Sequence, residues 1–381
     1  MLLLLQNWHR TRERGSGEWR MAADLQQTPA WFLWLAVLGA LHVAVLSSRL
    51  LVHLAHCVRR PKDLRRYYGT WAVVTGPTSG IGRSVALELA RRGLDLVLVG
   101  IDAADLREVS DAVMSRHAVQ TRTVVFDLSL VSTPPRYHVV YTGLGYIGAH
   151  GDGLQALDDP LGRRRAGDEA LRRLRDVVEG LDVGVLVNNA GVMNPGAAFL
   201  HEADAEALIR MIRVNLWATT VVTAAVIPGM AARGRGAVVS MGSATSEAVS
   251  SFPLHAVYSG TKRYVAVLSG GLAAEYGGRG VDVQCQAPMF VATAMVAAFS
   301  ALWRPAPLVP TADAYARAAV RWVGRGGPLC VPSLRHRLLW CLLDVVPGCV
   351  QDWACLREGL RQRKTSRSRR SSTASACHAS N

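Results

Sequence analysis

The sequence predicts a doubly wound α/β domain, in which one parallel sheet is covered by helices on both faces. Three observations support this prediction: short Val- and Leu-rich runs recur along the chain, segments with a helical period separate them, and a glycine-rich turn follows the first run. Near-continuous apolar runs that alternate with helices are typical of parallel strands buried on both faces. The chain has 381 residues, 50% of them hydrophobic, which is enough for one large core domain.

The N-terminal part of the chain predicts a membrane anchor. Residues 1–27 are a basic extension without an assigned function, and Met21 is an alternative start. Within the expected anchor, residues 28–56, the stretch from Thr28 to Ser48 contains no charged residue, and about 20 apolar residues suffice to span a bilayer. A cleaved signal peptide and a buried core helix are the alternatives. The basic run from Arg59 to Arg66 follows directly, which favours a cytosolic location for the rest of the chain.

The α/β domain is expected at residues 68–333. Its candidate strands are WAVVT, LDLVLVG, TVVFDL, VGVLVNNAG, GAVVSMGS, VDVQCQAP and PLCVPS. Residues 130–166 interrupt the alternation, because they contain Gly, Pro and Tyr without a helical or strand period. We interpret them as an insertion, either a binding loop or translated intron. Without it, Ser129 would join a helix that begins at Gly167.

The end of the chain and the overall composition exclude several functions. Residues 334–364 have the composition of an amphipathic, basic segment, and residues 365–381 form a Ser- and Arg-rich tail that is expected to be disordered. The net charge is +14, but no basic run is interleaved with aromatic residues, which argues against a nucleic-acid-binding protein. Seven scattered cysteines without a CxxC pair argue against a metal site and against a disulfide framework.

The turn after the first candidate strand predicts a phosphate-binding loop. Glycines permit a tight turn and a close approach of the backbone to a pyrophosphate, and the N-terminus of the following helix attracts anions. The G-xxx-G-x-G spacing differs from the more common GxGxxG, and in isolation an ordinary strand–helix turn explains it equally well. The candidate cofactor-binding residues in this turn are Gly76, Ser79, Gly80, Ile81 and Gly82.

A tyrosine and a lysine predict acid–base chemistry. Tyr258 and Lys262 lie four residues apart in a segment expected to be helical, so their side chains share one face. A phenol with a pKa near about 10 is a weak acid at neutral pH, and a neighbouring ammonium group lowers that pKa. Ser243, at the end of the preceding strand, can hydrogen-bond a substrate carbonyl, and Asn215 lies in a helix upstream. An isolated YxxxK pair is more often a surface feature.

Taken together, these motifs resemble the short-chain dehydrogenase/reductase family, which has a Rossmann fold. The resemblance covers residues 68–333 apart from the insertion. Its elements are TGPTSGIG at 75–82, Asp127 after the third strand, NNAG at 188–191, Asn215, Ser243, Tyr258 and Lys262.

The family resemblance implies a role for each candidate site residue. Tyr258 would donate a proton to a keto oxygen that Ser243 orients. Lys262 would lower the pKa of the tyrosine and hold the nicotinamide ribose, and Asn215 would hold a water molecule of the proton relay. The glycine turn would hold the pyrophosphate, and Asp127 and Asn189 would line the adenosine side.

A closer resemblance links the chain to the very-long-chain 3-oxoacyl-CoA reductases of plants. It rests on the anchor and on GLDVGVLVNNAGV, FLHEADAEA, AVYSGTK and VDVQCQAPMFVATAM. It implies NADPH-dependent reduction of a 3-oxoacyl-CoA to the 3-hydroxyacyl-CoA in fatty-acid elongation, by a single-pass protein of the endoplasmic reticulum membrane. Other elongase subunits and a second copy in a homodimer are the implied candidate partners. The alternatives are a steroid 17β-dehydrogenase or other lipid-ketone dehydrogenase, and a non-catalytic paralogue or splice form that binds elongase partners.

One departure from this resemblance concerns the cofactor. The reductases usually place an arginine for the 2′-phosphate of NADPH after the second strand, where this chain has Ile101 and Asp102. Gly100 supplies no carboxylate that would repel the phosphate, and Arg83 is a candidate substitute. We therefore expect NADPH to be preferred over NADH, but less strongly than in relatives that carry the arginine.

Overall fold

The computed structural model describes residues 29–131, 161–194, 196–299 and 307–379. The chain divides into two units, Met1–Cys57 and Val58–Asn381. In the first unit the described residues form helix α2 (Ala30–Val58). This helix matches the anchor predicted at residues 28–56 and is long and apolar enough to cross a membrane, and none of its most apolar part is buried. It is therefore a candidate membrane span.

The second unit contains one parallel sheet of seven strands in the order β3-β2-β1-β4-β5-β6-β7. All seven predicted strands are confirmed: β1 (Trp71–Thr75), β2 (Asp95–Gly100), β3 (Thr121–Val125), β4 (Val183–Asn188), β5 (Gly236–Met241), β6 (Val281–Gln286) and β7 (Leu329–Cys330). The first three strands extend the sheet in one direction and the remaining strands extend it in the other. The order therefore reverses between β1 and β4, where ligand crevices of open α/β sheets form.

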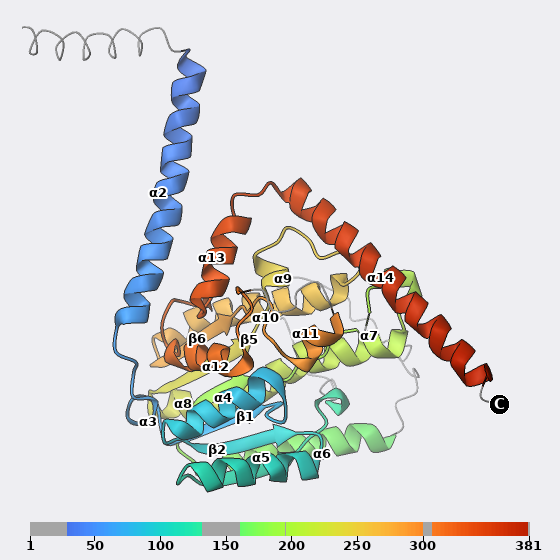
Figure 1. Ribbon diagram of the computed structural model, residues 1–381. Coiled ribbons are helices and arrows are strands. Elements are labelled where there is room, and N and C mark those ends of the chain that lie inside the picture. Colours follow the sequence, from blue (N-terminus) through green and yellow to red (C-terminus); the bar gives the residue numbers. More distant parts are fainter. Residues whose placement is uncertain (1–28, 132–160, 195, 300–306, 380–381) are drawn as a thin grey trace, which may run out of the picture. The chain divides into compact units, whose positions relative to one another are not determined.

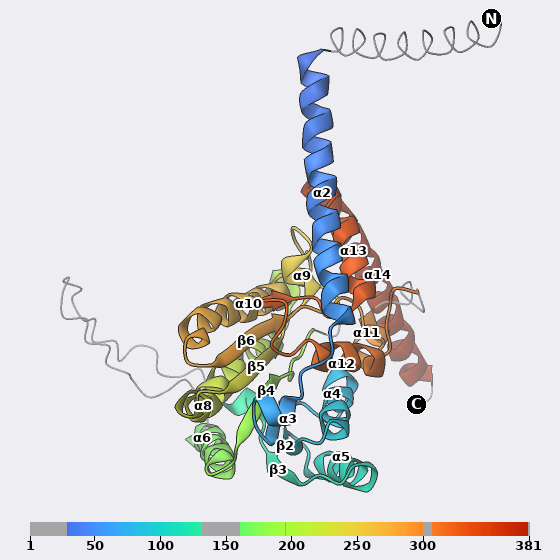
Figure 2. The same ribbon diagram turned by 90° about the vertical axis from the view of Figure 1, so that its left-hand side faces the viewer.

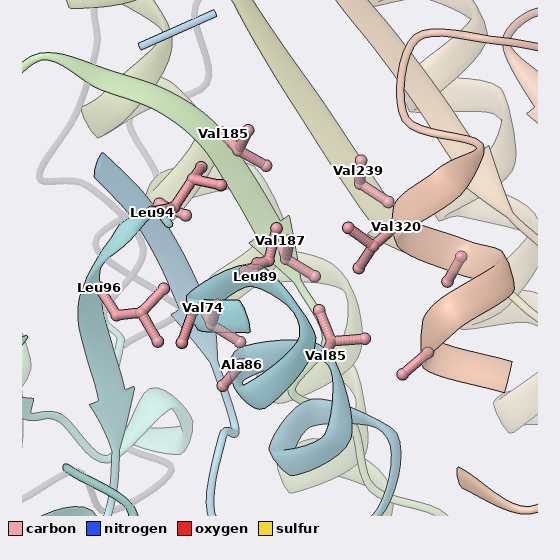
Figure 3. Packing of buried hydrophobic residues seen from close by; sticks show 14 of the residues in the cluster. Val74, Val85, Ala86, Leu89, Leu94, Leu96, Val185, Val187, Val239 and Val320 are labelled. Carbon is pink, nitrogen blue, oxygen red and sulfur yellow. The ribbon is translucent and has the colours of Figure 1, made fainter. Parts of the chain in front are cut away.

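Helices cover both faces of this sheet (Figures 1 and 2). On one face, α4 (Gly80–Arg91), α5 (Ala103–Arg116) and α12 (Ala312–Arg321) pack on residues such as Val74 and Leu96. Figure 3 shows this cluster, in which Val85 and Leu89 of α4 lie against the strands. On the other face, the helices α6 (Leu161–Val178), α8 (Ala218–Arg233) and α10 (Ala256–Gly277) pack on the alternate residues of the same strands. Successive strand residues point to opposite faces, so strands that are apolar throughout require both helical layers.

Shorter elements complete the domain. They are α3 (Leu64–Tyr67), η1 (Leu128–Leu130), η2 (Leu200–Glu202), α7 (Ala205–Ile212), the π-helical η3 (Arg213–Trp217), α9 (Ala244–Glu247), α11 (Ala294–Phe299), α13 (Leu334–Leu343) and α14 (Gly348–Ala379).

A second helical stretch is also long and apolar enough to cross a membrane. It runs from Ala205 to Arg233, and 44% of its most apolar part is buried. Val222, Val226 and Met230 of this stretch belong to the core cluster under α8. Packing on the sheet thus explains its apolar character, and we assign it to the domain core.

The predicted insertion lies mostly outside the described residues, at 132–160. Its two described ends lie side by side, because a Cβ atom at Gly167 would collide with the carbonyl oxygen of Leu130. Helix α6 begins at Leu161, before the expected end of the insertion at residue 166. The close approach of its ends supports the proposal that residues 130–166 are an excursion from one strand-to-helix connection.

The disorder expected for residues 365–381 remains a prediction, and the described C-terminal helix extends into this range. Helix α14 continues to Ala379. No glycine or proline follows Gly359, and since these are the residues that most disfavour helix, the sequence beyond it contains no strong helix breaker.

Candidate active site

The predicted glycine turn joins β1 to α4 at the reversal point of the sheet. Gly76 and Gly80 have φ angles of 63° and 52°, which side chains disfavour. A Cβ atom at Gly82 would collide with the carbonyl oxygen of Gly76, so only glycine fits there. The turn ends at Ser79, the extended N-cap of α4, and Ile81 follows in the first turn of the helix. The first N–H groups of a helix have no acceptor within it, which makes this N-terminus suited to an anion.

Asn189 fixes the glycine turn to β4. Its Nδ2 donates to the carbonyl oxygens of Thr75 (3.2 Å) and Gly76 (3.0 Å). In return, the Thr75 Oγ1 accepts hydrogen bonds from the backbone N–H groups of Asn189 and Ala190, both at 3.0 Å. These four bonds hold the carboxyl ends of β1 and β4 together.

Asp127 forms hydrogen bonds with a nearby residue just after β3. Its Oδ1 accepts hydrogen bonds from the backbone N of Ser129 (2.9 Å) and from the Ser129 Oγ (2.7 Å), which caps η1. The predicted contacts of Asp127 and Asn189 with an adenosine group remain predictions.

Asn215 connects the end of β4 to α10. It lies in the π-helical turn η3 and is 1% exposed. Its Oδ1 accepts from the backbone N of Val192 (2.8 Å), and its Nδ2 donates to the Val192 carbonyl (2.9 Å) and to the Thr261 Oγ1 (3.1 Å). A π-bulge is common at functional sites, and here it places a buried amide between two backbone segments of the crevice.

Ser243, Tyr258 and Lys262 come together at the carboxyl end of β5. The phenol of Tyr258 shares a hydrogen bond with the buried Ser243 hydroxyl. The Lys262 Nζ lies 5.9 Å from the centroid of the Tyr258 ring and donates to the carbonyl oxygen of Met241 (2.9 Å). A Cβ atom at Gly191 would lie 3.2 Å from the Lys262 Nζ and 3.4 Å from the Asn215 Oδ1. All four predicted catalytic residues therefore face one region of the crevice.

Burial dominates the electrostatics of this site. It raises the pKa of Tyr258, and the hydrogen bond to Ser243 opposes the shift. Burial also lowers the pKa of Lys262 to about 8. The sequence predicted a lowered pKa for Tyr258, and the structure gives the opposite direction because desolvation of the phenolate outweighs the other interactions. Tyr258 is therefore protonated at neutral pH and available as a proton donor.

An apolar cavity of about 160 Å³ lies beside Tyr258. Most of its wall comes from the segments around η2 and the start of α10, and one residue, Leu356, comes from α14. The apolar side chains of the wall include Phe199, Leu200, Leu208, Met211, Pro253, Leu254, Val257 and Leu356. Sequence reasoning missed these residues, because no local pattern shows that the C-terminal helix folds back onto the site.

A larger cavity, of about 700 Å³, does not belong to this site. It is lined by charged residues including Arg175, Asp182, Arg233 and Arg235, and by Val183 at the start of β4. It therefore lies at the amino end of the sheet, whereas the glycine turn and Tyr258 lie at the carboxyl ends of the strands.

Fold and site together define a doubly wound oxidoreductase domain. The chain belongs to the short chain dehydrogenase family, whose profile matches residues 70–133 and 151–302, more than half of the chain. The unmatched residues 134–150 lie inside the predicted insertion.

Two relatives and one solved structure illustrate which known proteins this chain is similar to. A very-long-chain 3-oxoacyl-CoA reductase-like protein of Arabidopsis thaliana is 39% identical over 307 residues, which cover 80% of this chain and 86% of the relative. An inactive hydroxysteroid dehydrogenase-like protein 1 of Pongo abelii is 32% identical over 69% of this chain and 68% of its own length. A short-chain dehydrogenase from Sphingobium yanoikuyae, solved in complex with NADPH, is 25% identical with a TM-score of 0.53, covering 74% of this chain and 94% of that structure.

The contacts of Asn215 predict a structural cost when its amide is removed. Asn215→Leu should lower the free energy of unfolding by about 1–3 kcal/mol, because both backbone groups of Val192 lose their partner. The control Thr261→Val removes one bond to the same amide and one to the Tyr258 carbonyl oxygen, but it leaves both backbone groups of Val192 paired and should cost less. Chemical denaturation of both variants measures the difference, and equal stability of Asn215→Leu and the wild type would contradict the bridging role.

Proposed function

We propose that the chain reduces very-long-chain 3-oxoacyl-CoA to the 3-hydroxyacyl-CoA with NADPH, as an enzyme of fatty-acid elongation. The observation that carries this proposal is the cluster of Ser243, Tyr258 and Lys262 beside an apolar cavity. Similarity to the reductase-like protein of Arabidopsis thaliana over most of the chain supports the choice of substrate.

The residues of the crevice fit a nicotinamide dinucleotide. A pyrophosphate would lie on the glycine turn, where Gly76, Gly80 and Gly82 leave the backbone uncovered at the N-terminus of α4. Ser79 and Ile81 belong to the same turn, and Lys262 would hold the nicotinamide ribose. When bound, the cofactor supplies the hydride for the carbonyl carbon. The similar Sphingobium enzyme was solved with NADPH, which supports this type of cofactor.

The chain's own residues would handle the proton. Tyr258 stays protonated because burial raises its pKa, so it can donate its proton to the keto oxygen. The Ser243 hydroxyl would donate a hydrogen bond to the same oxygen and fix its position. As Tyr258 becomes a phenolate, the charged ammonium group of Lys262 stabilises it.

Asn215 would act as a positioning residue in this scheme. One acceptor position of its Oδ1 is used by the backbone N of Val192, and an amide oxygen has two. The second would hold a water molecule near the Lys262 Nζ and thereby connect the lysine to solvent.

The cavity wall suits the apolar part of the substrate. Phe199, Leu254 and Leu356 are uncharged residues that line this cavity together with Tyr258. A keto group held by Ser243 and Tyr258 would thus have an apolar acyl segment at its side. A steroid ketone offers a similar apolar surface, and a comparison of the two substrates in one assay separates these functions.

Helix α2 and the similarity to elongation reductases support a membrane location. We place α2 as a single span in the endoplasmic reticulum membrane, with the catalytic domain on the cytosolic side because of the basic residues that follow it. We propose two kinds of protein partner at this membrane: other elongase subunits and a second copy of the chain.

Replacement of the proton donor tests the function directly. Tyr258→Phe should abolish NADPH oxidation with a long-chain 3-oxoacyl-CoA, in membranes that contain the protein, while the fold is retained, because only one hydroxyl is lost. Circular dichroism and NADPH binding serve as controls for folding. Activity within a few-fold of wild type would contradict the assignment. A wild type that is itself inactive would favour the non-catalytic alternative, to which the inactive relative is a precedent.

The pKa of Lys262 predicts the pH dependence of reduction. Lys262 carries its charge below its pKa of about 8, so kcat/KM for reduction should be constant below this pH and fall as the pH rises through it. Lys262→Arg keeps its charge throughout this range, so any activity that it retains should show no such fall. A wild-type profile that stays flat well above pH about 8 would contradict the role of the lysine charge.

The end of β2 predicts a modest preference for NADPH. Ile101 is 56% exposed, and the carboxylate of Asp102 caps α5 by accepting from the N–H groups of Ala104 (2.7 Å) and Asp105 (3.0 Å). The Nη2 of Arg83, the candidate substitute, lies 3.5 Å from the Glu108 Oε1. This ion pair competes with a 2′-phosphate for the arginine. Ile101→Arg should therefore lower the Kd for NADPH and leave that for NADH unchanged. Ile101→Gln is the uncharged control, and equal Kd values for all three chains would refute this placement of the 2′-phosphate.

A further inference from the structure

The two C-terminal helices form an elbow whose outer surface is apolar. Helices α13 and α14 are bent by 114° relative to each other at residues 344–347. Figure 1 shows the elbow projecting from the sheet and its covering helices. Large apolar side chains with 36% to 62% exposure follow both arms around it: Leu334, Leu338, Leu342, Val345, Val346, Val350 and Trp353. Their spacing of three or four residues places them along one face of each helix.

Two carbonyl groups at the bend accept hydrogen bonds from a side chain of the next helix. The Gln351 Nε2 donates to the carbonyl oxygens of Leu343 (2.8 Å) and Val346 (3.0 Å). These groups lie where the helical hydrogen-bond pattern of α13 ends. An elbow that entered an apolar medium would need such partners, because an unsatisfied carbonyl is costly there.

The charges around the elbow suit the surface of a lipid bilayer. The guanidinium of Arg357 lies 5.2 Å from the centre of the exposed Trp353 ring, and Arg335 is exposed on α13. Tryptophan with a neighbouring arginine is typical of the membrane interface, where the ring lies at headgroup level and the cation faces phosphates. Asp344 is the exposed carboxylate at the bend and limits how deeply the elbow can enter.

Several contacts hold α14 to the body of the domain. The Ser250 Oγ donates to Asp352 Oδ1 (2.7 Å), and Ser251 hydrogen-bonds the same carboxylate. Further along the helix, Arg363 forms an ion pair with Glu202. Leu356 lies between these two attachments and lines the cavity beside Tyr258, so the same helix forms one arm of the elbow and part of the cavity wall.

We propose that this elbow inserts into the surface layer of a lipid bilayer. Helix α13 has 10 residues and is about 15 Å long, too short to span a membrane, so the contact is interfacial. The candidate membrane span α2 ends at Val58, and α3 of the catalytic unit begins at Leu64. The five residues between them extend to at most about 18 Å, so a membrane that holds α2 would be within reach of the catalytic unit. The proposal shares the membrane location with the proposed function but does not depend on catalysis.

A fluorescent label at the elbow tests the insertion in the full chain. Cys349 is exposed at the start of α14, while Cys285 and Cys330 are buried. The chain with Cys57, Cys341, Cys355 and Cys377 changed to serine would be labelled at Cys349 with an environment-sensitive dye and reconstituted in vesicles of phosphatidylcholine and phosphatidylserine. We expect a blue-shifted emission and a loss of fluorescence when lipids with doxyl groups near the headgroup are included.

Two control variants sharpen this test. In the first, Cys349→Ser is combined with Met114→Cys, which puts the label at an exposed apolar position on α5; its fluorescence should not respond to doxyl lipids. In the second, Val345→Asp and Val350→Asp place charges at exposed positions of the elbow. The Cys349 label should then return to the emission of water, although α2 still holds the chain in the vesicles.

Three results would overturn the proposal. A Cys349 label with the emission of water in the vesicles would show that the elbow stays in solution. A blue shift without quenching by doxyl lipids would show that protein covers it, and a cross-linker at Cys349 that joins two chains would identify a second copy as that cover. Since the readout is fluorescence, these results are independent of whether the Tyr258→Phe experiment supports the reductase function.

Discussion

The hydrogen bonds between the ends of β1 and β4 are the interaction on which the site depends. Parallel strands on either side of a reversal in order have helices that diverge, which leaves a crevice at their carboxyl ends. Thr75 and Asn189 close the backbone across this gap with four bonds. They fix the glycine turn and, through Val192 and Asn215, the neighbouring end of α10. The glycine turn and the cluster of Ser243, Tyr258 and Lys262 are thereby held at the same end of the sheet.

Burial then decides which chemistry this floor supports. Tyr258 and Lys262 are shifted in opposite senses, because desolvation disfavours the phenolate and the ammonium ion alike. The result is a protonated phenol beside a lysine whose charge is lost just above neutral pH. That combination suits proton donation to a carbonyl, which is the requirement of a reductase, and it agrees with the membership of the chain in a family of oxidoreductases.

The elbow of α13 and α14 links the cavity beside Tyr258 to the proposed membrane contact. Leu356 lines the cavity beside Tyr258, while Trp353, one helical turn earlier, is exposed on the elbow. A substrate with a long apolar chain partitions into lipid rather than water. A helix that contacts both the cavity and the bilayer would therefore shorten the path of such a substrate to the crevice.

The sequence by itself determined the seven strands and the helical layers, because apolar periodicity and turn residues act locally, and the family resemblance implied that Asn215, Ser243, Tyr258 and Lys262 share one site. The carboxyl ends of parallel strands lie at one edge of a sheet, so motifs that follow strands, such as the glycine turn and Ser243, come close together. The tertiary structure alone decided the contacts of Asn189, the direction of the Tyr258 pKa shift and the return of Leu356 to the cavity. Desolvation and contacts between distant segments depend on how all elements pack, and no local pattern along the chain records that packing.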